Sequence, residues 1–345
     1  MSAAVDKDAN PASPPAGLLA RLVAIHPVVP WVIGFVLLLP LPLLTMNAYQ
    51  QYILNVMLIN VILAVGLNIV KGFAGQVTVG HIALTAIGAY SSAVCATKLG
   101  MPFWLALPSA MLITAAAGAM IGIPSFRLEG AYLALATLGL GESVRIVISV
   151  TEPLGASIGY ENIPPPFLGS FALDGHRAYY YVVMPLALIG LYFSFSILRS
   201  DIGRAFKAVR EDALAAAATG VNVRKYKVIA FVLSALYAGC AGSLQAHMHP
   251  GFLHPNNYTL TEMVTLLLMV VFGGIGHIWG GVIGAVVVTI INERTADYYE
   301  YRMLIYGSII VFTVMFMPRG IGGIIDQYIV KKRFLAIRRA RTNAA

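Results

Sequence analysis

Long apolar stretches separated by short polar segments run through the chain from residue 28 to residue 320. A membrane-spanning helix needs about 20 apolar residues, because each residue rises about 1.5 Å across a hydrocarbon core about 30 Å thick. By this measure the sequence predicts an all-α, polytopic transmembrane helix bundle with about ten membrane segments. These fall near 28–45, 52–70, 79–97, 103–123, 131–150, 178–198, 227–247, 259–272, 278–292 and 303–318.

Composition agrees with a membrane location. Of the residues, 59% are hydrophobic and only 11% are charged, whereas a soluble domain carries about 25% charged residues. The first predicted segment holds Pro30, Pro40 and Pro42 and should be kinked. The two segments near 259–272 and 278–292 are short for a full span, so we expect half-helices that meet inside the membrane.

The distribution of Lys and Arg predicts the orientation of the chain. With ten segments and both termini in the cytoplasm, inside segments hold 18 of the 23 basic residues, outside segments hold 4, and Arg145 lies within a segment. Positive charge concentrates on the cytoplasmic side of membrane proteins. We therefore expect a disordered cytoplasmic tail (1–27), a transmembrane domain (28–320) and a basic cytoplasmic tail (321–345), and no nucleic-acid partner for the net charge of +8.

A glycine pattern occurs twice along the chain. Gly72, Gly75 and Gly80 recur at Gly273, Gly276 and Gly281 with a constant offset of 201 residues. In a chain with 33 glycines three matches can arise by chance. If the match is real, it marks a parallel repeat with two corresponding breaks in helix geometry.

The longest predicted inside loop, 199–227, holds a short helix. Seven of the residues from Ala205 to Ala218 are Ala, the best helix former, and Gly220 is a typical helix stop. One small apolar face follows a helical spacing through Phe206, Val209, Ala213 and Ala217. Small residues favour docking into a groove on another protein over lying on lipid headgroups, although both interpretations stay open.

The same loop resembles the cytoplasmic coupling loop of ABC-importer permeases of the branched-chain amino acid class. The resemblance rests on Gly203-Arg204-Ala205, the run 208–212, the Ala run and Gly220-Val221, and it extends to 72–81, 132–142 and 273–281. Size and spacing are similar to those of the larger of the two permeases in such systems. The residues that the resemblance assigns to the coupling helix are Gly203, Arg204, Ala205, Ala208, Arg210, Glu211, Asp212, Ala216 and Gly220.

The resemblance implies a permease domain over 28–320 that is one part of an importer in the bacterial cytoplasmic (inner) membrane. Its partners would be a second permease subunit, two cytoplasmic ATPase subunits and a periplasmic or lipid-anchored substrate-binding protein. ATP and Mg²⁺ would bind the ATPase subunits, and this chain would carry no cofactor. The chain has no G-x-x-x-x-G-K-[ST] motif, so it lacks a standard phosphate-binding loop.

Polar residues at membrane depth are costly and therefore candidates for function. Glu142 and Arg145 are three residues apart and can pair, either within a polar path or as a pair that fixes helix packing. The candidate substrate-path residues are Asn60, Asn68, Gly75, Gln76, His81, Glu142, Gly273, Gly274 and Gly276.

No nucleophile with a paired base and no catalytic carboxylate pair emerges from the sequence, so we do not expect an enzyme. His247, His249 and His254 lie in an outer Pro- and Gly-bearing region without a fixed ligand face, and no metal site is predicted there. For the family, branched-chain amino acids are the expected substrate. Alternatives are a permease for urea or short amides, a secondary transporter that works alone, and a membrane scaffold.

Overall fold

The structure is a computed structural model that describes residues 34–36, 38–44, 47–128, 130–168, 171–295, 301–317 and 320–323. The chain divides into two compact units, Met1–Leu44 and Thr45–Ala345. The first unit contains the short helix α3 (Leu41–Leu44). The predicted tail 1–27, the beginning of the first predicted membrane segment and most of the predicted tail 321–345 lie outside the described residues.

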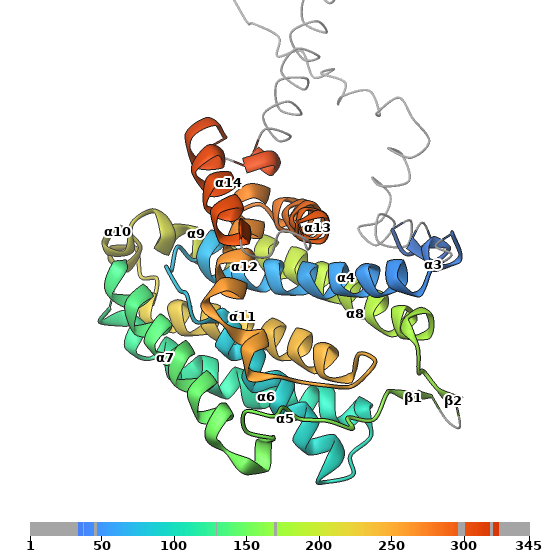
Figure 1. The fold of residues 1–345 in the computed structure, drawn as a ribbon. Helices are drawn as coiled ribbons and strands as arrows, with labels where there is room; N and C mark the ends of the chain where they lie inside the picture. The colour runs from blue at the N-terminus through green and yellow to red at the C-terminus, as the bar shows by residue number, and fades with distance from the viewer. Residues whose placement is uncertain are drawn as a thin grey trace, which may run out of the picture. The chain divides into compact units, whose positions relative to one another are not determined.

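The second unit is built from helices (Figure 1). In chain order these are α4 (Ala48–Asn68) with its π-helical extension η1 (Ile69–Phe73), α5 (His81–Thr97), α6 (Phe103–Gly122), α7 (Ala131–Val150), α8 (His176–Arg199), α9 (Asp201–Glu211), α10 (Ala213–Ala218), α11 (Val223–His247), α12 (Leu260–Gly273), α13 (Ile278–Arg294) and α14 (Arg302–Phe316).

Three 3₁₀ turns and one small hairpin lie in the connections. The turns are η2 (Pro124–Phe126), η3 (Glu152–Leu154) and η4 (Pro255–Tyr258). The strands β1 (Phe167–Leu168) and β2 (Phe171–Ala172) pair antiparallel, with Phe167 opposite Ala172 and Leu168 opposite Phe171. The loop after α7 is thus irregular with brief local structure, as its Gly and Pro content predicts.

Five helices within the described residues are long and apolar enough to cross a membrane: Ala48–Phe73, Phe103–Phe126, Ala131–Val150, His176–Arg199 and Val223–His247. Each predicted segment from the second to the tenth coincides with a helix. However, α5, α12, α13 and α14 have 17, 14, 17 and 15 residues. A 14-residue helix extends only about 21 Å, so the all-helical membrane fold is confirmed whereas ten full spans remain a prediction.

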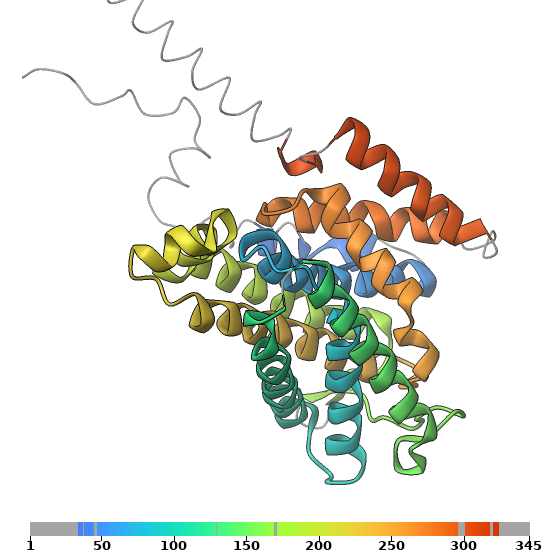
Figure 2. The ribbon, with the colours of Figure 1, turned by 90° about the vertical axis from the view of Figure 1, so that its left-hand side faces the viewer.

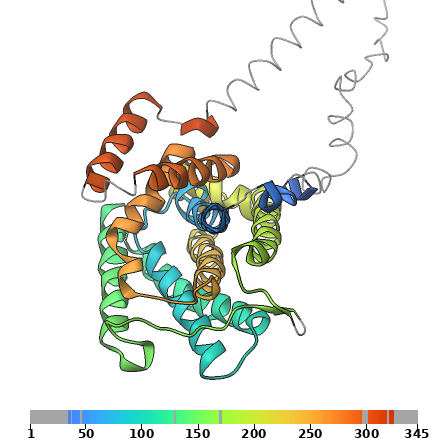
Figure 3. The ribbon, with the colours of Figure 1, turned by 45° about the vertical axis from the view of Figure 1, so that its right-hand side comes forward.

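Helix α11 occupies the centre of the second unit. In the most apolar 18-residue stretch of α11, 72% is buried, whereas only 17% of the corresponding stretch of α7 is buried. Small residues bring its backbone close to its neighbours: a Cβ atom placed on Gly88 of α5 would lie 2.6 Å from the Cα atom of Gly239 of α11. Figure 3 looks along α4 and shows α7 at the edge of the unit, outside α5.

The loops gather at two opposite ends of the helices. At one end Tyr160 N–H donates to Leu253 O at 2.8 Å, and Lys98 Nζ donates to Pro153 O at 2.8 Å. At the other end α9 lies beside η1 (Figure 2). Loops that the charge pattern assigns to the outer side thus contact one another, and so do those assigned to the inner side.

Candidate functional site

The predicted coupling helix is two helices, α9 and α10, which meet at a corner. Asp212 adopts an extended backbone conformation with φ −157° and ψ 111°. Its carboxylate accepts hydrogen bonds from Leu214 N–H at 2.8 Å and Ala215 N–H at 3.0 Å. The expectation of one continuous helix is therefore wrong, because Asp212 caps a new helix and competes with continuation of the first.

The corner also divides the predicted apolar face. Phe206 and Val209 of α9 are buried, and the Phe206 ring lies edge-on to that of Tyr226 with centroids 6.3 Å apart. On α10, however, Ala216 is buried and Ala217 is exposed. The change of helical phase at the corner turns the face that the continuous spacing predicts away from the bundle.

Helix α10 ends in a glycine cap. Gly220 has a φ of +91°, its N–H donates to Ala217 O at 3.0 Å, and Val221 N–H donates to Ala216 O at 3.0 Å. These two bonds are those of a Schellman motif. Leu214, on the outer side of α10, is 84% exposed. The loop therefore presents a capped, small-residue helix with one large apolar side chain in the open.

The remaining predicted coupling residues lie along α9. Gly203 is pressed against the Leu198 backbone, with 2.6 Å between a Cβ placed on it and the Leu198 Cα. Arg204 pairs with Asp201 on the exposed side. The others differ in burial: Ala205 is buried, Ala208 is half-buried, and Glu211 is exposed.

The two glycine patterns meet in space. Gly75 and Gly276, which correspond across the offset, both have left-handed backbone conformations, with φ +70° and +84°. A Cβ placed on Gly72 would lie 2.5 Å from Gly276 N, so the two breaks are in direct contact. The first break separates η1 from α5 and the second separates α12 from α13. Equivalent conformations at equivalent positions support the repeat that the sequence indicates.

Asn68, at the end of α4, joins the two breaks. Its Oδ1 accepts from Gly276 N–H at 2.9 Å, and its Nδ2 donates to His277 O at 2.8 Å. The side chain is 1% exposed. Both hydrogen-bonding groups of the amide are therefore used to hold the second break against the end of α4.

Glycines also form the crossing of α12 and α13. A Cβ on Gly280 would lie 2.8 Å from Gly274 O, and one on Gly284 would lie 2.9 Å from Gly273 N. Gly274, which ends α12, has a φ of +118° that favours glycine. The short helices predicted near 259–272 and 278–292 thus form a tight helical pair.

The other predicted path residues are hydrogen-bonded within the bundle. Asn60 Nδ2 donates to Thr289 Oγ1 of α13 at 3.0 Å. Gln76 Nε2 donates to Ala74 O at 3.1 Å. The buried His81 Nδ1 lies 3.0 Å from Ser234 Oγ of α11. The contacts of Asn60 and His81 connect helices, whereas that of Gln76 is local to the first break. A role of the three side chains in a substrate path stays a prediction.

Glu142 and Arg145 form the ion pair that their spacing predicts. Arg145 Nε donates to Glu142 Oε2 at 3.0 Å, and the side chains are 47% (Glu142) and 26% (Arg145) exposed. The pair lies on α7, the least buried of the five helices of spanning length. Exposure of a charged pair to lipid is energetically costly, so this face is poorly suited to contact lipid alone.

A surface cavity of about 620 Å³ lies between α7 and α5, with Ile113 of α6 at its side. Its walls are mainly aliphatic and include Val94, Ile113 and Val147, with Ser91 and Ser143 as polar members. It therefore offers an apolar environment next to the exposed helix.

The three outer histidines have separate partners. His247 Nδ1 lies 2.7 Å from Pro164 O and its Nε2 lies 3.0 Å from Ser92 Oγ. His249 pairs with Asp174, and His254 accepts from Asn256 N–H. Within the described residues no group of three His, Cys, Asp or Glu could hold a metal ion.

The bond network around His247 was missed by the sequence analysis. Ser92 of α5 and Ser243 of α11 are fully buried with their Oγ atoms 2.7 Å apart, and Ser92 also contacts His247. Ser92 lies on α5 and Ser243 four residues before His247 on α11. The spacing on α11 places Ser243 and His247 on one face, but nothing in the sequence pairs them with α5.

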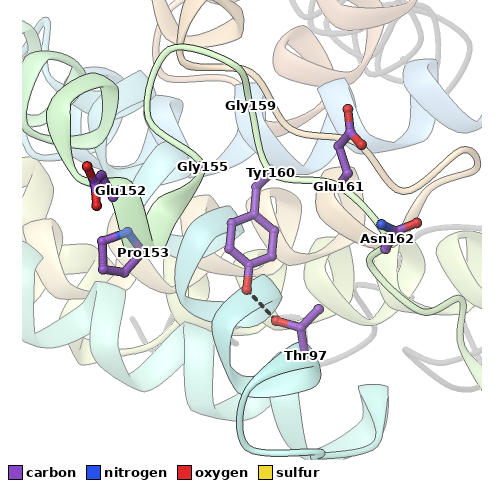
Figure 4. Close-up of a pocket in the computed structure, with 8 residues that line it drawn as sticks. All are labelled: Thr97, Glu152, Pro153, Gly155, Gly159, Tyr160, Glu161 and Asn162. Carbon is purple, nitrogen blue, oxygen red and sulfur yellow. Dashed lines mark hydrogen bonds between the residues drawn. The ribbon is translucent and has the colours of Figure 1, made fainter.

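A further pocket of about 340 Å³ lies among the loops that the charge pattern assigns to the outer side (Figure 4). At its base the hydroxyls of Tyr160 and Thr97 are hydrogen-bonded. Figure 4 shows the carboxylates of Glu152 and Glu161 pointing away from this bond and from each other. The side chains do not converge on one point, so the arrangement suits no general acid–base chemistry.

Comparisons with known proteins agree with these features. A family described as "Branched-chain amino acid transport system / permease component" matches residues 49–315. The high-affinity branched-chain amino acid transport system permease protein LivM of Escherichia coli is 36% identical over 290 residues, which cover 76% of this chain and 68% of LivM. No solved structure matches.

In two less similar relatives, the match to this chain covers a larger share of the relative's own length. The permease protein BraD of Pseudomonas aeruginosa is 26% identical over 302 residues, 80% of this chain and 96% of BraD. LivH of Escherichia coli is 26% identical over 289 residues, 76% of this chain and 90% of LivH. With these matches and its apolar helices, the chain is an integral membrane protein that belongs to the branched-chain amino acid transport permease family.

Proposed function

We propose that this chain is the transmembrane permease subunit of an ABC importer that moves branched-chain amino acids across the bacterial cytoplasmic membrane. ATP would be hydrolysed by two cytoplasmic partner subunits, and a binding protein would deliver the substrate from outside. Both termini would be cytoplasmic. The observation that carries the proposal is the α9–α10 corner, an exposed helical element fixed to two spanning helices.

The corner suits docking because its outer side is small and apolar. Leu214 is 84% exposed, and α10 otherwise consists of Ala. A single exposed leucine on an alanine helix can enter a groove on a partner, in the way amphipathic helices bind grooves. The corner connects α8 to α11, the central helix. A displacement of the docked corner would therefore reach the middle of the bundle.

The exposure of α7 supports a second permease. This chain covers α7 only partly, because only 17% of its most apolar stretch is buried and the Glu142–Arg145 pair lies on its surface. A neighbouring permease would remove the charged pair from lipid and complete the pore. LivM and LivH are both named as permease proteins of one type of transport system.

An aliphatic amino acid fits the surroundings of α7. The cavity of about 620 Å³ beside it has mainly aliphatic walls, and aliphatic side chains gain from leaving water. These walls favour a branched-chain amino acid over urea, which has no aliphatic side chain.

The test is co-expression of this chain with the candidate second permease and ATPases, followed by purification and reconstitution with the binding protein. We expect both ATPases and the second permease to co-purify and leucine uptake to require ATP. Uptake by the chain alone without ATP would refute the importer and favour a secondary transporter. ATP-dependent uptake of urea but not leucine would refute the substrate.

Docking is tested separately with Leu214→Asp. We expect the variant to lose co-purifying ATPase while its own thermal stability is unchanged, because the side chain makes little contact within the chain. The matched control is Ile158→Asp, which changes an 81% exposed residue in the outer loop and should retain the ATPase. Equal ATPase recovery from both variants would contradict docking through α10.

A further inference from the structure

The side chain of Arg210 leaves α9 and ends between the two glycine breaks. Its Nη1 donates to Gly72 O of the first break. A Cβ placed on Gly75 would lie 2.8 Å from Arg210 Cγ, and one placed on Gly276 would overlap Arg210 Nη1. One side chain of the cytoplasmic corner thus contacts two segments that are 201 residues apart in the sequence.

The electrostatics of this position suit an arginine. Gly72 O is one of the last carbonyls of the helix formed by α4 and η1, and such carbonyls have no partner within the helix. The second break follows the C-terminal end of α12. Cations are stabilised at helix C-termini, and the planar guanidinium offers donors in several directions where a lysine offers a point charge.

The glycines provide the space for this side chain. Gly75 and Gly276 have positive φ values of +70° and +84°, and each lies against the Arg210 side chain. A side chain at either position would displace Arg210. The repeat therefore creates two equivalent glycine positions, and a single cation from a third segment lies between them.

Asn68 extends the contact of Arg210 with the first break to the beginning of α13. Asn68 binds Gly276 N–H and His277 O, which joins the end of α4 to the beginning of α13. The end of α4, four residues before Gly72, is thus hydrogen-bonded to the second break, which offers a path by which a movement at Gly72 would reach α13. Coupling of this kind requires a contiguous set of packed and hydrogen-bonded groups.

We propose that Arg210 is the positioning residue through which the α9–α10 corner moves both glycine breaks together. The inference rests on the proposed ATP-driven function and deepens it by assigning the step between docking and the spanning helices. Docking belongs to α10, and transmission belongs to Arg210. The two roles should therefore separate in experiments.

The experiment uses the complete reconstituted complex with Arg210→Ala in the permease. We expect the ATPases to co-purify and ATP to be hydrolysed as in the wild type, while leucine uptake per ATP falls about tenfold or more, within the 5- to 150-fold range of typical coupling. Arg210→Lys should restore little, because a point charge cannot contact both breaks. The control is Lys207→Ala, an exposed residue one turn earlier on α9 that should keep the wild-type ratio.

A second variant tests the same contact from the glycine side. Gly276→Ala keeps the arginine but fills its place, so it should lower uptake per ATP as Arg210→Ala does. Its control is Gly100→Ala, which also puts alanine at a positive φ, +62°, but where the added methyl meets nothing within 4 Å. If both changes act through one contact, the double variant should be no worse than either single variant.

The outcomes separate this inference from the proposed function. A wild-type complex without ATPases would end both. Wild-type coupling together with an unchanged ratio in Arg210→Ala would overturn this inference alone. Loss of the ATPases from both Arg210→Ala and Gly276→Ala would also overturn it, because the contact would then only stabilise the fold.

Discussion

Replacing Asn68 tests how the two glycine breaks are held together. Asn68→Leu keeps a similar volume but removes both amide groups. Gly276 N–H would lose its partner, now at 2.9 Å, whereas His277 O would lose the 2.8 Å bond from Asn68 but keep a longer one from Gly281 N–H at 3.3 Å. The matched control is Asn60→Leu on the same helix, which loses one bond to Thr289 Oγ1.

The magnitude follows from the groups left behind. A buried donor without a partner, here Gly276 N–H, costs about 1–3 kcal/mol, and the lost bond to His277 O adds about 0.6 kcal/mol, because that carbonyl keeps Gly281 N–H as a donor. Gly276 and His277 are half-buried, which favours the lower end, about 2 kcal/mol. The Thr289 hydroxyl keeps its bond to Ala285 O at 2.7 Å, so Asn60→Leu should cost only about 0.6 kcal/mol, the average for side-chain bonds between membrane helices.

The assay is the free energy of unfolding, measured by SDS titration in mixed micelles. We expect Asn68→Leu to lose more than twice as much stability as Asn60→Leu. Leucine uptake by the Asn68 variant should fall as well, because the second break would no longer follow the first. Equal losses in the two variants would show that the bonds of Asn68 to the second break contribute nothing special, and the account of the joined breaks would be wrong.

Three further predictions concern other parts of the molecule. Asp212→Ala removes the cap of α10 and should cost about 1 kcal/mol, seen as faster hydrogen exchange at the amides of Leu214 and Ala215; unchanged exchange would contradict the capping role. Gly242→Ala should destabilise the chain by about 1–3 kcal/mol, because its methyl would lie 2.7 Å from Ala89 N. Gly307→Ala in α14 meets nothing within 4 Å and replaces a poor helix former with the best one, so it should not lower the melting temperature. Glu142→Leu leaves Arg145 without its partner on the exposed face of α7 and should reduce recovery of the second permease; full recovery would argue that this face does not meet that subunit.

The sequence alone determined the class of the molecule and the positions of most helices. Apolar stretches of spanning length depend only on composition, because lipid requires every backbone group to bond within a helix. The pair Glu142–Arg145 could also be predicted, because residues three apart on a helix are neighbours wherever the helix lies. The glycine pattern with its offset of 201 also pointed to both breaks, although Gly281 lies inside α13.

Contacts between distant segments needed the tertiary structure. The bonds of Asn68 to Gly276 and His277, and the placement of Arg210 between both breaks, join residues from segments far apart in the sequence. Hydrophobic periodicity reports which face of a helix avoids water, and it carries no information on which helix lies opposite. The network of Ser92, Ser243 and His247 could not be predicted from the sequence for this reason.

The coupling loop shows the same division within one segment. Its alanines and Gly220 predicted helix and stop correctly, because propensity and capping are local properties. The corner at Asp212 was missed, since an aspartate is tolerated inside a helix as well as at its start. Burial of Phe206 and Val209 against the bundle fixed the direction of α9. The Asp212 cap turns the chain, and the packing of α9 decides that Leu214 faces outward while Arg210 reaches the glycine breaks.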